Sequence, residues 1–372
     1  MTKWQKVKLG DYLSKVKTGK LDANASCENG AYPFFTCAID PLKIDTYSYD
    51  CECVLVAGNG DLNVKYYQGK FDAYQRTYIL ESKDKRQLNV KFLYYFMRHY
   101  LDNLRLQAFG GIIKYIRLNN IIDAQISLLP KEEQERIAKE LDAVSDLLAK
   151  QKQLLTEQDT LIKSVFYDMF GDPVTNDKGW TIEKLEKLGT CKNGINFNKE
   201  EQGSRCYLLN VGDFQNHSVL DKITYFSEVV LKKMPDDDYF LKSGDIVFVR
   251  SNGNKNLVGR CVAIYPQDNK VLYSGFCIRF RIKQDDITTK YLLYYFKDDN
   301  IRKLLVGRGA NIQNLNQKVL HQLNIPVPPL SLQQKFADIV KQIEAQKQKI
   351  KSAITETETL FNALMVKYFD ED

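Results

Sequence analysis

Apolar side chains recur at alternating intervals of four and three residues in two stretches of about 40 residues each. This spacing places them on one face of an α-helix and is typical of a coiled-coil seam. Pro130 and Pro329 mark where each helix begins, and Gly171-Asp172-Pro173 ends the first one. We therefore predict two helices, each about 60 Å long at 1.5 Å per residue. The predicted seam residues are Ile137, Leu141, Val144, Leu148, Leu155, Ile162 and Val165 in the first helix and Phe336, Val340, Ile343, Ile350, Ile354, Phe361 and Leu364 in the second.

The two predicted helices are expected to pack against each other. A single helix with an apolar stripe exposes that stripe to water, and two similar stripes in one chain bury each other most simply. The alternative is that each helix packs separately on its own domain. The apolar pattern is compatible with both arrangements.

The segments outside the two helices indicate a mixture of strands and short helices. Residues 54–57 and 245–249 are apolar runs of strand length, each followed by a polar, glycine-containing loop. Residues 274–282 alternate weakly and also indicate a strand. Residues 91–100 and 290–297 are rich in Leu, Tyr and Phe, and we expect them to form short helices packed on a sheet.

The chain contains an internal repeat at an offset of about 199 residues. The sequence Leu-Tyr-Tyr-Phe at 93–96 recurs at 293–296, and Gly110, Pro130 and Gln134 recur 199 positions later. A period this long indicates two copies of a whole domain followed by a helix, rather than a solenoid. The predicted boundaries are 1–130 for the first domain, 131–172 for the central helix, 173–329 for the second domain and 330–372 for the C-terminal helix.

The distribution of charge separates the domains from the helices. The net charge is +6, from 53 Lys and Arg against 47 Asp and Glu. Residues 1–130 carry +5 and residues 173–329 carry +6, whereas residues 131–172 carry −4 and residues 330–372 carry −1. This alternation favours two modules that meet a polyanion, joined by modules that do not.

The motifs of several enzyme classes and of metal sites are absent from the sequence. It contains no phosphate-binding Gly-x-x-x-x-Gly-Lys-Ser/Thr motif, no Asn-Pro-Pro-aromatic or Asp-Pro-Pro-aromatic motif of an amino-methyltransferase, and no Cys-x-x-Cys pair. The three histidines have no partner at metal or catalytic-triad spacing, and Asp236-Asp237-Asp238 is expected to be a solvated acidic run. We therefore predict a binding protein with no catalytic residue, no metal and no cofactor.

The sequence also indicates a compartment. No apolar run approaches the roughly 20 residues of a membrane span, and the Met1-Thr2-Lys3-Trp4 start lacks the apolar core of a secretory signal. With eight cysteines and no such signal, we expect reduced thiols in a cytoplasmic protein that has no membrane partner.

The polar loops of the two basic segments combine cations, amides and aromatic side chains. Lys and Arg neutralise phosphates of any sequence, whereas Arg, Asn and Gln form bidentate hydrogen bonds with base edges. A solvated loop without a DNA role remains the alternative for each single residue. The candidate DNA-binding residues are Asn59, Asn63, Lys65, Tyr67, Lys70, Arg76 and Lys114 in the first segment and Arg250, Asn252, Asn254, Lys255, Arg260, Arg308, Asn311 and Gln313 in the second.

The order of these motifs resembles that of the specificity subunits of type I restriction–modification systems, over nearly the whole chain. The segment NIPVPPLSLQQKF at 324–336 is similar to the helix-entry segment of that family, and ISLLPKEEQERI at 126–137 is its first copy. GANIQNLN at 309–316 and MFGDP at 169–173 are also similar. The first copy departs from the pattern, because residues 110–115 read GGIIKY and are more apolar.

The resemblance implies an α/β (mixed α+β) fold with two globular target-recognition domains. Two long antiparallel helices would join them as a coiled coil, with internal pseudo-two-fold symmetry. Each domain would read one half of an asymmetric, bipartite site in double-stranded DNA, and the helix pair would set the unread spacer. Catalysis would belong to partners: two modification subunits that use S-adenosylmethionine, docked on the helices, and ATP-dependent restriction subunits.

Two other function classes stay open at this point. One is an enzyme whose active site is not recognisable from sequence motifs, and methylation or cleavage by the chain alone would favour it. The other is a coiled-coil scaffold without a DNA role, for which binding to partners alone, independent of salt, is expected. A DNA-binding subunit should instead lose affinity for duplex DNA as salt rises, because salt weakens phosphate contacts.

Overall fold

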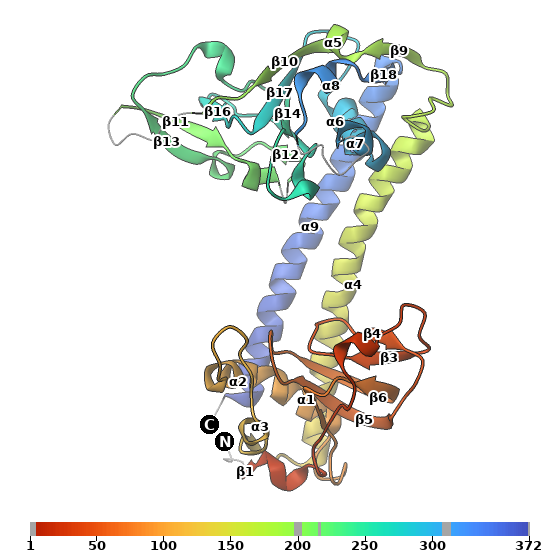
Figure 1. The fold of residues 1–372 in the computed structure, drawn as a ribbon, viewed down its shortest axis with the longest axis vertical. Coiled ribbons are helices and arrows are strands. Elements are labelled where there is room, and N and C mark those ends of the chain that lie inside the picture. Colours follow the sequence, from red (N-terminus) through yellow and green to blue (C-terminus); the bar gives the residue numbers. More distant parts are fainter. Residues whose placement is uncertain (1–4, 197–202, 215–216, 307–313, 371–372) are drawn as a thin grey trace. The chain divides into compact units, whose positions relative to one another are not determined.

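The computed structural model describes residues 5–196, 203–214, 217–306 and 314–370. The chain divides into two compact units, which we describe separately (Figure 1). The first unit comprises residues 1–153 and 350–372, and the second comprises residues 154–349. Each unit therefore contains part of both long helices, whereas the domains predicted from the sequence end where the helices begin. None of the helices in the described part of the chain is long and apolar enough to cross a membrane.

The first unit is built on a six-stranded mixed sheet with strand order β2-β7-β5-β6-β3-β4. β5 pairs antiparallel with both β6 and β7, and β3 pairs parallel with the end of β6. A separate ladder joins β1 to β8. The elements are β1 (Lys6–Lys8), β2 (Lys17–Thr18), β3 (Tyr32–Phe35), β4 (Leu42–Ile44), β5 (Tyr49–Ala57), β6 (Val64–Ala73), β7 (Thr77–Leu80), α1 (Val90–His99), α2 (Leu101–Gln107), α3 (Leu118–Ile122) and β8 (Gln125–Ser127), with short 3₁₀ turns at Leu9–Tyr12 and Ala23–Ala25.

The second unit contains a five-stranded sheet of order β10-β17-β14-β15-β12 and a three-stranded sheet of order β13-β11-β16. A separate ladder joins β18 to β9. The elements are β9 (Thr181–Lys184), α5 (Leu185–Leu188), β10 (Gly189–Asn193), β11 (Ser204–Leu209), β12 (Val219–Leu220), β13 (Ser227–Leu231), β14 (Asp245–Val249), β15 (Cys261–Ile264), β16 (Val271–Tyr273), β17 (Cys277–Ile282), α6 (Thr289–Lys297), α7 (Asp299–Val306), α8 (Gln317–His321) and β18 (Asn324–Val327), with 3₁₀ turns at Val211–Phe214, Ile223–Tyr225, Asp237–Tyr239 and Lys255–Leu257.

The two units share one strand order. β10-β17-β14-β15 corresponds to β2-β7-β5-β6, and β11 lies parallel to β16 as β3 lies parallel to the end of β6. The difference is that β6 is continuous, whereas residues 265–270 separate β15 from β16. The predicted class, a mixed helix-and-sheet fold with two repeated domains, is confirmed. The strand expected over residues 274–282 begins only at Cys277, because the N–H of Cys277 donates to the Ser274 carbonyl in a turn, 2.9 Å apart.

The long helices are α4 (Lys131–Phe170) and α9 (Leu330–Phe369), and each begins directly after a proline. Within the first unit, Arg136 of α4 lies next to Tyr368, and Lys152 pairs with Glu358 at 2.9 Å. As the residue number rises along α4, the contacting residue on α9 has a lower number, so the two helices run antiparallel within the first unit (Figure 1). In the second unit the Lys347 ammonium contacts the Asp159 carboxylate at 2.7 Å, which continues the antiparallel order.

Both helices contribute to the apolar core of each unit. All fourteen predicted seam residues are buried or half-buried. In the second unit the rings of Phe166 and Phe170 on α4 lie 5.6 and 5.3 Å from the ring of Phe336 on α9, and both contact Tyr291 of α6. Phe166 and, in the first unit, Met365 are buried although the predicted seam omits them. The helix segments therefore pack on the domains as well as on each other, because domain side chains cover a wider face than a coiled-coil seam.

A buried glutamine holds the start of each long helix to its unit. The Gln134 side chain, which is fully buried, accepts from the N–H of Asn89 at 2.8 Å and donates to the Gln87 and Leu129 carbonyls at 2.7 and 2.8 Å. One side-chain amide thus provides hydrogen-bond partners for backbone groups of both the loop before α1 and the segment before α4. Gln333, its repeat equivalent, makes the same three bonds, accepting from the N–H of Thr288 at 2.8 Å and donating to the Asp286 and Pro328 carbonyls at 2.9 and 2.8 Å.

Candidate nucleic-acid interface

Three segments of the first unit meet around the glycine that follows β5. The Gly58 N–H donates to the Arg76 carbonyl at 2.7 Å, and the Gly58 carbonyl accepts from the N–H of Ile116 at 2.9 Å. The Gly60 N–H donates to the Lys114 carbonyl at 2.9 Å. A Cβ added at Gly58 would lie 2.4 Å from the Arg76 carbonyl oxygen, so this approach requires glycine. We name residues 58–60, 76 and 114–116 the first loop cluster.

The second unit builds the same arrangement after β14. The Arg250 N–H donates to the Phe276 carbonyl at 2.8 Å, and the Arg250 carbonyl accepts from the N–H of Leu315 at 2.8 Å. Ser251 and Asn314 form an isolated antiparallel bridge, as Asn59 and Tyr115 do in the first unit. We name residues 250–256, 276 and 314–315 the second loop cluster.

The two loop clusters share a backbone framework but present different side chains. Arg250 stands where the first cluster has Gly58, and Phe276 stands where it has Arg76. Asn314 likewise replaces Tyr115. Because backbone bonds position the loops and side chains read bases, this arrangement can hold two different recognition surfaces on one framework.

The predicted residues of the second segment lie mostly in the second loop cluster. The Asn252 and Asn254 side-chain oxygens accept from the N–H groups of Asn254 and Asn256, at 2.8 and 3.0 Å, which shapes the loop as successive Asx turns. Lys255 is exposed, whereas Arg260 is half-buried behind the loop, where its carbonyl accepts from Val249. The remaining candidates, Arg308, Asn311 and Gln313, lie outside the described residues.

The predicted residues of the first segment divide into two groups. Asn59, Arg76 and Lys114 belong to the first loop cluster. Asn63 lies just beyond it, and its amide nitrogen donates to the Cys37 and Asp61 carbonyls at 2.8 and 2.9 Å, so this side chain shapes the loop.

The other three candidates of the first segment lie along β6. The half-buried Lys65 donates to the Asn63 side chain, and burial lowers the pKa of its ammonium. The Tyr67 ring packs on Phe35 at 5.0 Å. Lys70 lies opposite Asp50, at the other end of the β5–β6 ladder from the loop. The hydrogen bonds of Asn63 to the loop carbonyls and the packing of Tyr67 on Phe35 favour structural roles for these two side chains.

Sequence reasoning missed two exposed features of the loop clusters. Phe276 is 54% exposed, and its position follows from the repeat, because it lies 200 residues after Arg76. In the sequence, residues 110–115 stand out only as a departure from the family pattern, although Ile112 among them is fully exposed. Comparing equivalent positions of the two copies would have identified both.

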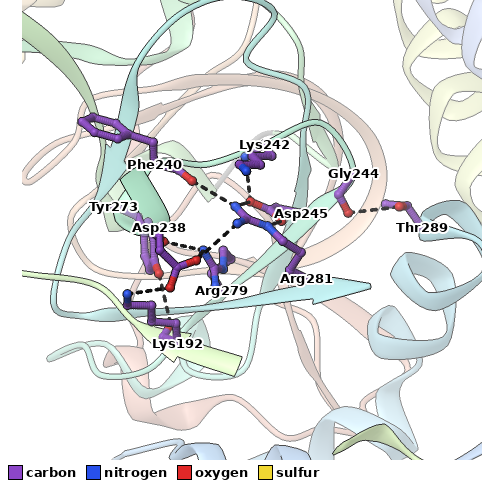
Figure 2. Close-up of polar contacts among 10 residues, drawn as sticks. All are labelled: Lys192, Asp238, Phe240, Lys242, Gly244, Asp245, Tyr273, Arg279, Arg281 and Thr289. Atoms are coloured by element: carbon purple, nitrogen blue, oxygen red, sulfur yellow. Dashed lines mark hydrogen bonds and ion pairs between the residues drawn. The ribbon is translucent and has the colours of Figure 1, made fainter. Parts of the chain in front are cut away.

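A network of charged side chains in the second unit forms an internal clamp rather than a binding site. The Asp245 carboxylate accepts two 2.7 Å hydrogen bonds from Arg281 (Figure 2). Asp238 contacts Lys192 at 2.6 Å and Arg279 at 3.3 Å, and the hydrogen bond from Lys192 holds the pKa of Asp238 below its ordinary value. Asp238 is exposed, in agreement with the expected solvated acidic run, and it is in addition paired with cations. Its cationic partners come from strands distant in the sequence.

Metal-binding clusters and reactive thiols are two features that a catalytic site could use. Among the described residues, no group of three or more His, Cys, Asp or Glu side chains could hold a metal ion. All eight cysteines are free thiols. Burial raises the pKa of Cys191, Cys261 and Cys277 to about 12, so these thiols stay protonated at neutral pH and are poor nucleophiles.

Comparisons with known proteins agree with the duplicated architecture. The family model described as "Type I restriction modification DNA specificity domain" matches residues 1–157 and again residues 177–357. The specificity subunit of the type I restriction enzyme EcoDI from Escherichia coli is 43% identical over 141 residues, which cover 38% of this chain and 31% of that subunit. The MjaVIII specificity subunit from Methanocaldococcus jannaschii is 24% identical over 375 residues, covering 92% and 86%.

A solved structure shares the fold. The S subunit of a type I restriction–modification system from M. genitalium superposes with a TM-score of 0.59 at 17% identity, covering 99% of this chain and 96% of that one. A structure reported for complex assembly and conformational transition of the type I system gives a TM-score of 0.59 at 16% identity, covering 98% and 97%.

Proposed function

The chain belongs to the type I restriction–modification DNA specificity family, and we propose that it is the non-catalytic subunit that selects the DNA sequence. In this proposal each unit reads one half of a bipartite site in double-stranded DNA. The observation that carries the proposal is the pair of loop clusters, which repeat one backbone framework with different side chains. Different side chains on equivalent loops predict two different half-sites, and hence an asymmetric target.

The charges of the loops support contact with a duplex. Arg250 and Lys255 lie among polar residues in the second loop cluster, and Arg76 and Lys114 lie in the first, where apolar side chains flank Lys114. Lys and Arg at such positions neutralise phosphates, and Arg also reads guanine through two hydrogen bonds. The internal clamp uses its cations on carboxylates of the same unit, so we assign no DNA contact to it.

We further propose that two modification subunits dock on the long helices and that restriction subunits join through the complex. Leu154 and Leu161 lie seven residues apart on the part of α4 that belongs to the second unit, and both are exposed. Because seven residues make almost two helical turns, they lie on one helix face. Exposed apolar side chains aligned in this way are typical of protein contact surfaces. The free cysteines are in keeping with our proposal that the chain acts in the cytoplasm.

A map of modified bases in host DNA, with and without this chain, tests the proposed function. We expect one bipartite motif to lose its methylation when the chain is absent. In the Arg250→Ala variant methylation should weaken at this motif, because a lost bidentate base contact costs about 1–3 kcal/mol, or about 5- to 150-fold in affinity. Lys255→Ala should also weaken it, because a phosphate contact is lost. Lys283→Ala, an exposed lysine outside the second loop cluster, is the control.

The outcomes of this map separate the function classes. A map that does not change when the chain is removed would contradict the DNA-recognition role and favour a scaffold. An unchanged map in both variants, with the motif still dependent on the chain, would remove only the assignments of Arg250 and Lys255.

We propose that the helix pair sets the spacer between the half-sites. Four helix-forming residues inserted after Gln153 in α4 and four after Lys349 in α9 would add about one turn, or about 6 Å, to each helix. We expect the unread spacer in the modification map to lengthen by about one or two base pairs, at about 3.4 Å per base pair. An insertion in only one helix is the control and should abolish modification. The original spacer in the double-insertion variant would refute the ruler role.

A further inference from the structure

Residues 109–115 of the first unit form a short hairpin with an apolar tip. The N–H of Phe109 donates to the Tyr115 carbonyl at 2.9 Å, and the N–H of Tyr115 donates to the Phe109 carbonyl at 2.8 Å. Gly110 has a φ of 109°, and a Cβ added there would lie 2.6 Å from the Ile113 carbonyl oxygen. The hairpin is therefore a defined turn that requires glycine at this position.

The side chains on this hairpin are unusually apolar for a solvent-facing loop. Ile112 is fully exposed and Ile113 is 63% exposed, and Phe109 and Tyr115 beside them are also exposed. Isolated exposed apolar residues are common, but a contiguous group marks a surface that contacts another molecule. No such group is needed to close the turn, because backbone bonds and Gly110 already do so.

The surroundings of the tip favour DNA as the molecule it contacts. The hairpin shares residues 114 and 115 with the first loop cluster, where the Lys114 carbonyl accepts from the N–H of Gly60. Lys114 is exposed, and the Arg117 guanidinium lies 5.0 Å from the centre of the Phe109 ring. Apolar side chains flanked by cations match a DNA duplex, which offers bases to the apolar tip and phosphates to the cations. An apolar protein surface fits less well, because these cations would lose their hydration there without gaining a partner.

We propose that Ile112 and Ile113 form an apolar tip that contacts bases of the first half-site. This inference rests on the proposed function. At the offset of 199 residues, the second copy has Asn311 where the first has Ile112, whereas Ile312 matches Ile113, so the two copies differ in sequence at the first of the two tip positions. The apolar surface of DNA that an isoleucine meets is either a thymine methyl group or an unstacked base step.

The test measures binding of the assembled complex of this chain with its modification subunits. The DNA is a duplex with the motif found in the modification map. We expect Ile112→Ser to weaken binding about tenfold or more, because the variant loses the apolar side chain that DNA would remove from water. Leu106→Ser is the matched control, since Leu106 is 85% exposed on α2 but lies outside the hairpin. The control should bind as the unaltered chain does.

Two modified duplexes identify the surface that the tip meets. Replacing thymine by uracil in the first half-site removes only the methyl group. If this replacement weakens binding of the unaltered complex as much as Ile112→Ser does, and does not weaken binding of the Ile112→Ser complex further, the tip contacts the methyl group. The fluorescence of a 2-aminopurine base in the first half-site rises when a neighbouring base step unstacks. A rise on binding of the unaltered complex that is absent with the Ile112→Ser complex would show that the tip inserts between bases. Either result supports the proposal.

Two outcomes would overturn it. The first is unchanged DNA affinity of the Ile112→Ser and Ile113→Ser complexes. The second is failure of these variants to assemble with the modification subunits, which would assign the tip to a protein contact. Failure of the unaltered complex to bind its motif would instead contradict the proposed function, so the two failures are distinguishable.

Discussion

Gln333→Leu should destabilise the second unit by about 3 kcal/mol or more. Leucine has a similar volume but makes none of the three hydrogen bonds of the Gln333 amide. The N–H of Thr288 and the carbonyls of Asp286 and Pro328 would then lack their partner, and each such loss at a buried or half-buried site costs about 1–3 kcal/mol. Urea unfolding measures this loss, and hydrogen exchange should locate it at the start of α6 and at β18.

The repeat supplies the controls for this experiment. Gln334→Leu changes the same residue type at the neighbouring exposed position and should leave the free energy of unfolding within about 0.5 kcal/mol. Gln134→Leu should cause a similar loss in the first unit, because Gln134 makes the same three bonds. Equal stability of the Gln333→Leu and Gln334→Leu variants would contradict the anchoring role.

Phe336→Ala should cost the second unit about 3–5 kcal/mol, the range for removing a buried phenylalanine. The Phe336 ring is fully buried and contacts the rings of Phe166 and Phe170 on α4 and of Tyr294 on α6. Its loss would open a cavity where α4, α9 and the domain meet. Thermal or urea unfolding of the second unit measures the change.

A seam position away from the domain core provides the comparison. Ile354 lies on α9 and is only half-buried, so Ile354→Ala should cost clearly less than Phe336→Ala. This difference would show that the docking of the helix segments into the domains contributes more stability than the seam between them. A loss at Ile354 equal to that at Phe336 would contradict this interpretation.

Much of the fold could be predicted because its signals are local. The four-and-three spacing and the prolines at 130 and 329 located α4 and α9, and the apolar run at 245–249 coincides with β14. The repeat then predicted that one topology occurs twice, and the shared strand order bears this out. Burial of Phe166 and Met365 was missed, because the seam pattern counts only contacts between helices.

The candidate interface was less accessible to prediction. The composition of the sequence locates the polar loops, but it does not distinguish residues of the loop cluster from residues that pack in the domain. Arg76 is of the first kind, since its carbonyl accepts from Gly58, and Tyr67 is of the second kind, since its ring packs on Phe35. Both residues lie in one short polar and aromatic stretch. Which of them faces solvent depends on the pairing of strands that are distant in the sequence. The DNA-binding assignments themselves stay predictions until the modification map is measured.

By itself, the sequence determined that this protein has two long helices, two copies of one mixed domain and basic domains with acidic helices, because periodicity, repetition and charge are properties of the chain alone. Only the tertiary structure decided which loops meet, that Gln134 and Gln333 anchor the helices, and that Asp238 is paired with cations. These features depend on hydrogen bonds and packing between residues far apart in the chain, and no local pattern encodes them.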